Sequence, residues 1–262
     1  MRRFAGGPGA TKRLVPVHPV PMRTTFRHCI LANFAMAPDV LARRLPPHLQ
    51  PAVHDGRAFL SVVIARMERM RPAFLPAALG VTYSQVVYRA VVTCGNERGV
   101  HFLRSDADNG LMVAAGNALT FFRFHRADIT WSLDETSLRF QLKPRNDDTA
   151  AIHGDYNLRG GGTAMPASSR FATLEEAQGF LTELYVAFGR QRGDGSVEAV
   201  RIQRNAWRSV VVPDRVAVYQ AMSSGLLFDA AEAELDSCFY VEQMKYRWSR
   251  GTRVRPRGEQ TS

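Results

Sequence analysis

Gln85 and Arg89 are the pair of side chains in this sequence whose types and spacing best suit the binding of a small ligand. They lie four residues apart in Tyr83–Cys94, where the residue pattern alternates with a period of two. Alternate residues of a strand share a face, so both fall on the face that also carries Val87 and Val91. We expect them to form one polar patch on the inner side of a sheet. A strand face turned to water is the alternative that the pattern leaves open.

Amine nucleophiles and metal ligands are scarce. Lysine occurs only at Lys12, Lys143 and Lys245 among 34 basic residues, which limits any mechanism that needs an amine. Asp106 and Asp108 are the nearest approach to a cation site, but the later glycine and glutamate of a calcium loop do not follow them. We therefore interpret these two aspartates as part of a solvated turn.

Cofactor motifs are also missing from the sequence. The three cysteines, Cys29, Cys94 and Cys238, are far apart, with neither CxxC nor histidine-paired spacing, so we predict buried thiols rather than a zinc site or a disulfide framework. No glycine-rich loop of the phosphate-binding kind occurs. The sequence predicts neither a cofactor nor a metal.

The formal net charge of +10 is concentrated at the two ends of the chain. Met1–Arg27 carries no acidic residue and Lys245–Ser262 carries only Glu259, so the body between them is close to neutral. A phosphate-binding groove needs its positive charge on the folded surface. We therefore predict flexible basic extensions at residues 1–22 and 249–262, one folded domain at 23–248, and no specific nucleic-acid partner. A basic binding arm is the alternative.

The periodicity predicts a fold dominated by strands, with three helices among them. The first helix begins at Pro38 and ends before Pro46-Pro47, and the second is a helix of small residues over Gly110–Leu119. Thr173 and Glu176 form a capping box for the third helix. The apolar face of that helix is predicted to consist of Leu174, Ala177, Leu181, Leu184, Tyr185 and Phe188.

The sequence lacks the features of a membrane-bound or exported chain. No run of eighteen apolar residues occurs, and Met1–Met22 has no apolar stretch resembling a signal sequence. We expect no membrane partner and a cytoplasmic location.

Four segments, taken in order, resemble a known family. They are MAPDVLARRLPPHL at Met36–Leu49, the strand Ala58–Met70, GVHFLRSDADNGLMVAAG at Gly99–Gly116, and NAW at Asn205–Trp207. Their order and spacing resemble the YqjF-like family of conserved proteins of unknown function, within the acetoacetate-decarboxylase-like superfamily. The resemblance implies an α+β fold with about three helices, in which mainly antiparallel β sheets curl into a barrel or cone around an interior ligand cavity.

The resemblance also indicates which catalytic residues are missing. The decarboxylases form a Schiff base through a lysine whose pKa is lowered by a neighbouring cation. Matching their pattern to this chain places their glycine on Gly116 and their two adjacent lysines on Phe124 and His125. Their cavity arginine falls on Arg27 and a cavity glutamate on Gln85. The resemblance therefore implies that the cavity is kept and that the imine-forming amine is lost.

These observations predict a protein that binds a small organic acid in an interior cavity. Arg27, Gln85 and Arg89 would be its polar anchors, since a fixed arginine holds a carboxylate through two charge-assisted hydrogen bonds. Phe124 would make the cavity more apolar. The rival hypothesis is an imine-independent lyase, hydratase or hydrolase in which His125 is the acid or base. A structural role and a homo-oligomer remain open.

Overall fold

The computed structural model describes residues 18–145, 151–159, 161–190, 196–212 and 232–254. The helices are α1 (Pro38–Ala42), α2 (Gly110–Leu119) and α3 (Leu174–Leu181), with a 3-10 turn, η1, at Ala77–Leu79. The strands are β1 (Met22–Met36), β2 (Gln50–Pro51), β3 (Val53–His54), β4 (Arg57–Pro72), β5 (Val81–Cys94), β6 (Glu97–Ala107), β7 (Phe124–Leu133), β8 (Ser137–Pro144), β9 (Ile152–Asn157), β10 (Val186–Arg190), β11 (Val197–Arg204), β12 (Val210–Val211) and β13 (Ala233–Val254).

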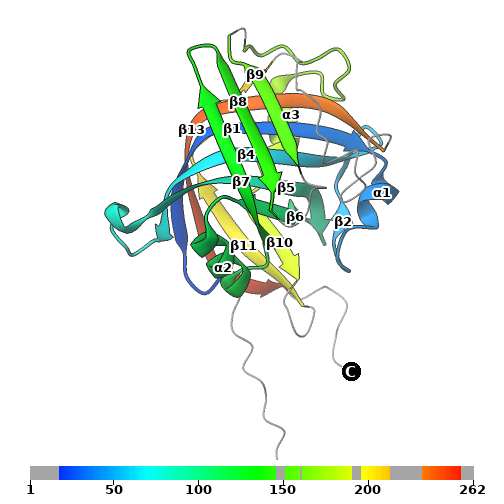
Figure 1. Cartoon of the computed structure of the whole chain (residues 1–262). Coiled ribbons are helices and arrows are strands. Elements are labelled where there is room, and N and C mark those ends of the chain that lie inside the picture. Colours follow the sequence, from blue (N-terminus) through cyan, green and yellow to red (C-terminus); the bar gives the residue numbers. More distant parts are fainter. Residues whose placement is uncertain (1–17, 146–150, 160, 191–195, 213–231, 255–262) are drawn as a thin grey trace, which may run out of the picture.

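The long strands close into a ring (Figure 1). The hydrogen-bonded order is β5, β4, β1, β13, β11, β10 and β6, and β6 pairs again with β5. Most of these pairs are antiparallel, whereas β10–β6 and β6–β7 are parallel. The expected α+β fold, with curled and mainly antiparallel sheets and three helices, is confirmed for the described residues.

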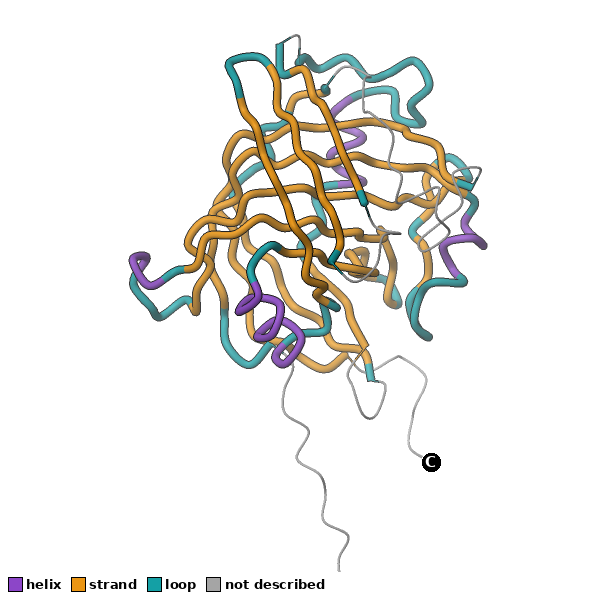
Figure 2. The backbone as a smooth tube through the Cα atoms, viewed as in Figure 1, coloured by secondary structure: helices purple, strands orange, loops and turns teal. Residues whose placement is uncertain are grey.

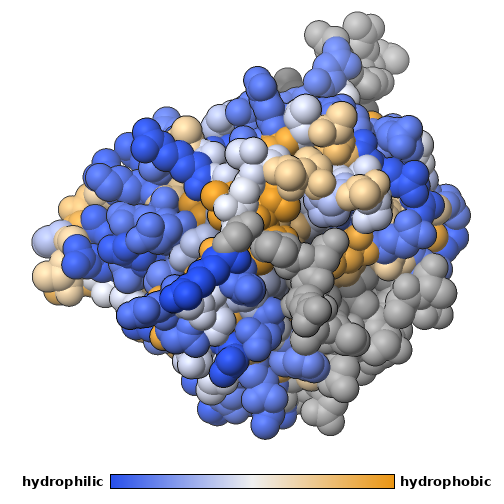
Figure 3. Space-filling view, turned by 90° about the horizontal axis from the view of Figure 1, so that it is seen from above, coloured by the Kyte–Doolittle hydropathy of each residue, from blue (hydrophilic) through white to orange (hydrophobic). Residues whose placement is uncertain are grey.

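The alternation of side chains along the ring produces two buried cores. On β5, Tyr83 and Val91 belong to the core inside the ring, and Val86 and Tyr88 belong to a second core outside it. The strands β7, β8 and β9 cross the outside of the ring at a steep angle (Figure 2) and contribute Phe140 and other apolar residues to the outer core. Both faces of the central strands are therefore covered. The surface seen from above is largely hydrophilic, with apolar residues gathered near its middle (Figure 3).

Helices α2 and α3 begin at residues whose side chains cap them. The side chain of Asn109 accepts a hydrogen bond from the backbone N–H of Met112 at the start of α2, and Thr173 accepts one from Glu176 at the start of α3. The third helix is shorter than predicted, because it ends at Leu181 and the chain then enters β10. Leu184 and Phe188 are buried, but they are not helical. The hydrogen bonds that β10 makes in closing the ring prevail over the helical pattern.

The residues that the structure describes extend beyond the predicted domain limits at both ends. Strand β13 continues past Trp248 to Val254, and its last residues pair with β11. At the other end, His18 is already buried. Basic residues in Ser249–Val254 thus lie on a paired strand, which accounts for the difference from the prediction. Residues 1–17 and 255–262, which belong to the predicted basic extensions, lie outside the described residues. None of the described helices is long and apolar enough to cross a membrane.

Candidate functional site

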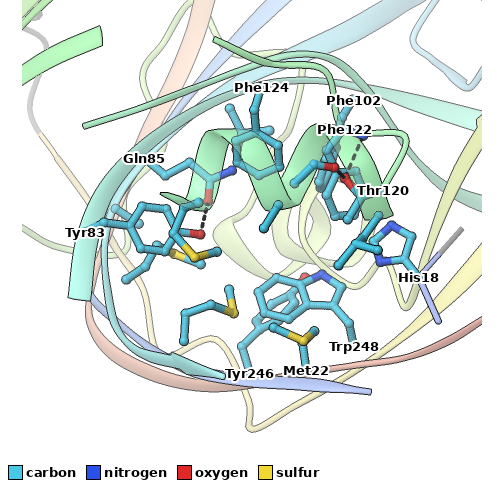
Figure 4. A pocket seen from close by; sticks show the side chains of 18 of the residues that line it. His18, Met22, Tyr83, Gln85, Phe102, Thr120, Phe122, Phe124, Tyr246 and Trp248 are labelled. Carbon is cyan, nitrogen blue, oxygen red and sulfur yellow. Dashed lines mark hydrogen bonds between the residues drawn. The ribbon is translucent and has the colours of Figure 1, made fainter. Parts of the chain in front are cut away.

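A cavity of about 140 Å³ lies inside the ring, between the inner faces of its strands and helix α2 (Figure 4). Its walls are mostly apolar, and they come from β1, β4, β5, β6, β7, β13, α2 and the segment before β1. The lining residues are His18, Pro19, Val20, Met22, Phe26, Val63, Ala65, Met67, Met70, Tyr83, Gln85, Val87, Arg89, Phe102, Met112, Ala115, Gly116, Leu119, Thr120, Phe122, Phe124, Tyr246 and Trp248.

Strand β5 supplies a row of polar groups to this cavity. Tyr83, Gln85, Val87 and Arg89 all line it, so the predicted shared face of Gln85 and Arg89 is confirmed and points inward. The Tyr83 hydroxyl donates a hydrogen bond to Gln85 Oε1 at 3.2 Å. Burial raises the pKa of Tyr83, which keeps its hydroxyl protonated as a donor.

Arg89 is a buried cation on the inner face of β5. Only 6% of the residue is exposed, and Nη2 donates to the carbonyl oxygen of Leu181 at 2.9 Å. Among the described residues, Nε has no hydrogen-bond partner and no carboxylate forms an ion pair with the guanidinium. Burial lowers the pKa of Arg89, because the charged form is removed from water, and the Tyr246 and Cys29 side chains act in the opposite direction.

Phe124 forms the wall where the second helix meets the sheet. Asn117 holds the start of β7 through both polar atoms of its side-chain amide: Oδ1 accepts from the Phe124 backbone N–H at 2.8 Å, and Nδ2 donates to the Phe124 carbonyl oxygen at 2.7 Å. The ring then packs on Gly116, where an added Cβ would lie 2.3 Å from Phe124 Cδ2. The position that the resemblance matched to a lysine therefore carries a phenyl ring, firmly held against a glycine.

Arg27 and His125 do not join these residues. Arg27 lies on the outer face of β1, with its side chain 36% exposed and its Nε 3.5 Å from a carboxylate oxygen of Glu68. The register of β1 against β4 shifts between Arg27 and Ile30, and His28 within this bulge has a φ of 49°. The bulge turns Arg27 outward although Cys29 faces the inner core. His125 is exposed on β7 and does not line the cavity.

The structure adds His18, a residue of the predicted flexible extension at residues 1–22. His18 lines the cavity, is 3% exposed, and packs edge-on against Phe121 and Phe122 at ring-centroid distances of 5.0 and 4.5 Å. Burial lowers its pKa to about 4, so the imidazole is neutral near pH 7. A histidine among prolines offered no periodicity from which this burial could be predicted.

Among the described residues, the remaining candidates supply neither an amine in the cavity lining nor a metal site. Lys143 and Lys245 are exposed, and Lys12 lies outside the described residues. Cys29 and Cys238 are buried, as predicted, while Cys94 is half-buried. In the part of the chain that the structure describes, no three histidine, cysteine or acidic residues gather as a metal site.

The solvated-turn interpretation is wrong for Asp106, whereas Asp108 is half-buried in the bend after β6. Asp106 is fully buried and accepts hydrogen bonds from Arg104 Nε at 2.8 and 3.0 Å. Asp108 accepts one from the backbone N–H of Ser84 at 2.8 Å. Asp106 is therefore half of an interior ion pair, and Asp108 joins the end of β6 to β5.

The chain matches the model of a known protein family over most of its length. Residues 23–245 match the model of DUF2071, described as an uncharacterized conserved protein (COG2071). The chain belongs to this family. A further relative is the uncharacterized protein YqjF of Bacillus subtilis (strain 168), which is 24% identical over 166 residues, or 63% of this chain. That match spans 65% of the length of YqjF.

Solved structures place the DUF2071 chain in the acetoacetate-decarboxylase-like fold. The acetoacetate decarboxylase of Legionella pneumophila has a TM-score of 0.63 at 13% identity, with 95% of this chain and 93% of that chain covered. An acetoacetate decarboxylase-like enzyme from Sphingomonas wittichii RW1 gives 0.60 at 15% identity, with 95% and 100% covered. The enduracididine biosynthesis enzyme MppR, solved with pyruvate, gives 0.60 at 12% identity, with 96% and 99% covered. At these identities the similarity concerns the fold.

Proposed function

We propose that this protein binds a small organic acid in the cavity inside the ring. Arg89 holds the carboxylate, the amide of Gln85 donates a further hydrogen bond, and Phe124 and the other apolar walls contact the hydrocarbon part. The observation that carries the proposal is Arg89, a buried cation on the cavity wall that pairs with no carboxylate among the described residues.

The energetics of burial support an anionic ligand. Removing a charged group from water costs several kcal/mol unless an opposite charge and hydrogen bonds offset the cost. A single bond to the Leu181 carbonyl uses one of the five N–H groups of the Arg89 guanidinium. A carboxylate accepts two parallel bonds from such a fork and neutralises its charge. MppR, with a similar fold, was solved with pyruvate, itself a small carboxylate.

We further propose that the protein does not decarboxylate through an imine. A Schiff base needs a neutral primary amine in contact with the substrate carbonyl. The described cavity lining contains no lysine, and the Phe124 ring fills the space beside Gly116. Proton transfer by His125 is not part of the proposal, because this exposed residue lies outside the cavity lining.

Isothermal titration with a series of carboxylic acids from butanoate to decanoate tests the binding proposal. Arg89→Met should weaken binding about 10- to 100-fold, because hydrogen bonds to a charged group contribute about 1.5–3 kcal/mol. Arg27→Met is the matched control and should bind like the wild type, since Arg27 lies outside. Unchanged binding by Arg89→Met, or loss of binding by Arg27→Met instead, would contradict the proposal.

Borohydride reduction in the presence of acetoacetate or pyruvate tests the absence of imine chemistry. We expect no covalent adduct in the intact-protein mass spectrum. An adduct on Lys12, Lys143 or Lys245 would show that an amine does reach the substrate and would overturn this part of the proposal.

A further inference from the structure

In the segment His18–Pro21, the first three residues line the cavity. The His18 backbone N–H donates to the carbonyl oxygen of Leu119 at 2.6 Å, and the His18 carbonyl accepts from Gly251 at 3.0 Å. The Pro21 carbonyl accepts from Ala73 at 2.8 Å. These three bonds tie the segment to the end of α2, to β13 and to the residues after β4. The segment is thus fixed in place as part of the site.

His18 faces Gln85 across the cavity. In Figure 4, Tyr83 and Gln85 lie on one side, His18 and Thr120 lie on the other, and Phe124 and Trp248 are between them. The His18 imidazole is held by its neighbours: the backbone is bonded on both sides, and the ring packs edge-on against Phe121 and Phe122. The backbone also has a φ of 53°, which is uncommon for histidine.

Two ring nitrogens in this part of the lining are buried polar atoms. Among the described residues, neither His18 Nε2 nor Trp248 Nε1 makes a hydrogen bond, although both atoms are buried. A buried polar group without a partner costs about 1–3 kcal/mol. Such a cost is offset when a bound molecule supplies the missing partner. The side of the cavity away from Gln85 is therefore built to receive a polar group.

The chemistry of the two rings defines that polar group. Because burial lowers the pKa of His18 to about 4, its imidazole is neutral near pH 7. It therefore has no charge that a second carboxylate of the ligand would balance. A neutral imidazole nitrogen is either a donor or an acceptor, and the indole N–H of Trp248 only donates. A hydroxyl group satisfies either histidine tautomer and also accepts from an indole.

We infer that His18 is a specificity-determining residue that binds a hydroxyl group of the ligand on the side of the cavity across from Gln85. The ligand class is then an organic acid with a hydrocarbon chain and a distal hydroxyl. This inference rests on the proposed binding of the carboxylate by Arg89 and adds a second point of recognition to it. The two points together fix the length of the chain between them.

Isothermal titration with paired ligands tests the inference. The pairs are the unsubstituted acids from butanoate to decanoate and their ω-hydroxy derivatives. At one chain length, the wild type should bind the hydroxy acid about 10-fold more tightly than the unsubstituted acid, as one satisfied buried hydrogen bond predicts. His18→Phe, which keeps the ring and removes both nitrogens, should lose this preference. His18→Gln, whose amide reaches the position of Nε2, should retain part of it.

A second measurement needs no variant. The ¹⁵N resonance of His18 Nε2 should shift on addition of the preferred hydroxy acid and stay in place with the unsubstituted acid of the same length. Acids that bind without any hydroxyl preference, a preference that persists in His18→Phe, or an unshifted Nε2 resonance would overturn the role of His18 and leave the carboxylate site standing. If no acid binds at all, the proposed function itself fails.

Discussion

Two arginines lie on the strands that flank β4, one on each face of the ring. The surroundings that stabilise their positive charges differ. Arg27, on the outer face of β1, is about one third exposed and lies near the Glu68 carboxylate. Arg89, on the inner face of β5, is buried beside apolar walls and is bonded to the Leu181 carbonyl. Water and an acidic neighbour stabilise the outer charge. Among the described residues the inner charge has no acidic neighbour and little contact with water, which is why we propose that a ligand pairs with it.

The comparison also shows that sequence position alone does not identify the inner arginine. Strict alternation would place Arg27 on the same face as Cys29 and Leu31, both of which face the inner core. The bulge at His28 shifts the phase by one residue. Strand β5 has a register shift only beyond Tyr88 in its pairing with β6, and the inward face runs unbroken from Tyr83 to Arg89.

The largest expected effect comes from adding charge to the interior by lowering the pH. His18 and His101 are both buried and both have a pKa lowered to about 4, from an ordinary value of 6.5. Between these two values the unfolded chain binds more protons than the folded one, so stability is lost as the pH falls from about 7 towards 4. At pH 5 the loss is on the order of 2 kcal/mol for each histidine.

Urea unfolding at pH 7 and pH 5 measures this loss. The comparison includes His18→Gln and His101→Asn, and the asparagine amide can still donate to the Phe188 carbonyl that His101 Nδ1 contacts at 2.9 Å. Each variant should show a smaller loss between the two pH values than the wild type. Equal losses in all three proteins would mean that other groups control the pH dependence.

The next effect contrasts a glycine at the cavity with one away from it. Gly116→Ala should destabilise the protein by about 1–3 kcal/mol, because the new Cβ would meet the Phe124 ring at 2.3 Å. Gly179→Ala, in α3, meets nothing within 4 Å and should stabilise by about 0.5–1 kcal/mol through helix propensity. Chemical denaturation gives both values. If Phe124→Leu fails to rescue Gly116→Ala, the explanation by ring contact is wrong.

The smallest effect concerns the stability of the two arginine variants without ligand. Arg27→Met should change the free energy of unfolding by less than about 1 kcal/mol, since the Glu68 pair is solvent-screened. Arg89→Met should leave the unliganded protein as stable as the wild type or up to about 1 kcal/mol more stable, because replacing a buried charge by an apolar side chain of similar size is often neutral or favourable.

A clear loss of stability in Arg89→Met, measured by thermal unfolding without any acid present, would mean that Arg89 serves the fold. The contrast between the inner and the outer arginine would then be one of structure and not of ligand binding.

Sequence patterns predicted the helix and the strand face whose structure depends on residues close together in the chain. The bounds of α2 and the shared face of Gln85 and Arg89 came from periodicity alone, and the ring came from the family resemblance. The parts that tertiary contacts decide were not predictable. The segment Val186–Arg190 continues a helical pattern yet pairs as a strand, and His18 owes its burial to bonds with Leu119 and Gly251, which are distant in sequence.

The pairing of β1 with β13 has a consequence for how the chain is made. Phe26 lies opposite Met244, so the ring cannot close until almost all of the described chain has left the ribosome. Until then β1 and β11 each present an unpaired edge, and the apolar inner face stays open to water. Because contacts between such distant residues form slowly, folding of this protein should be completed after synthesis and should expose an aggregation-prone intermediate to molecular chaperones.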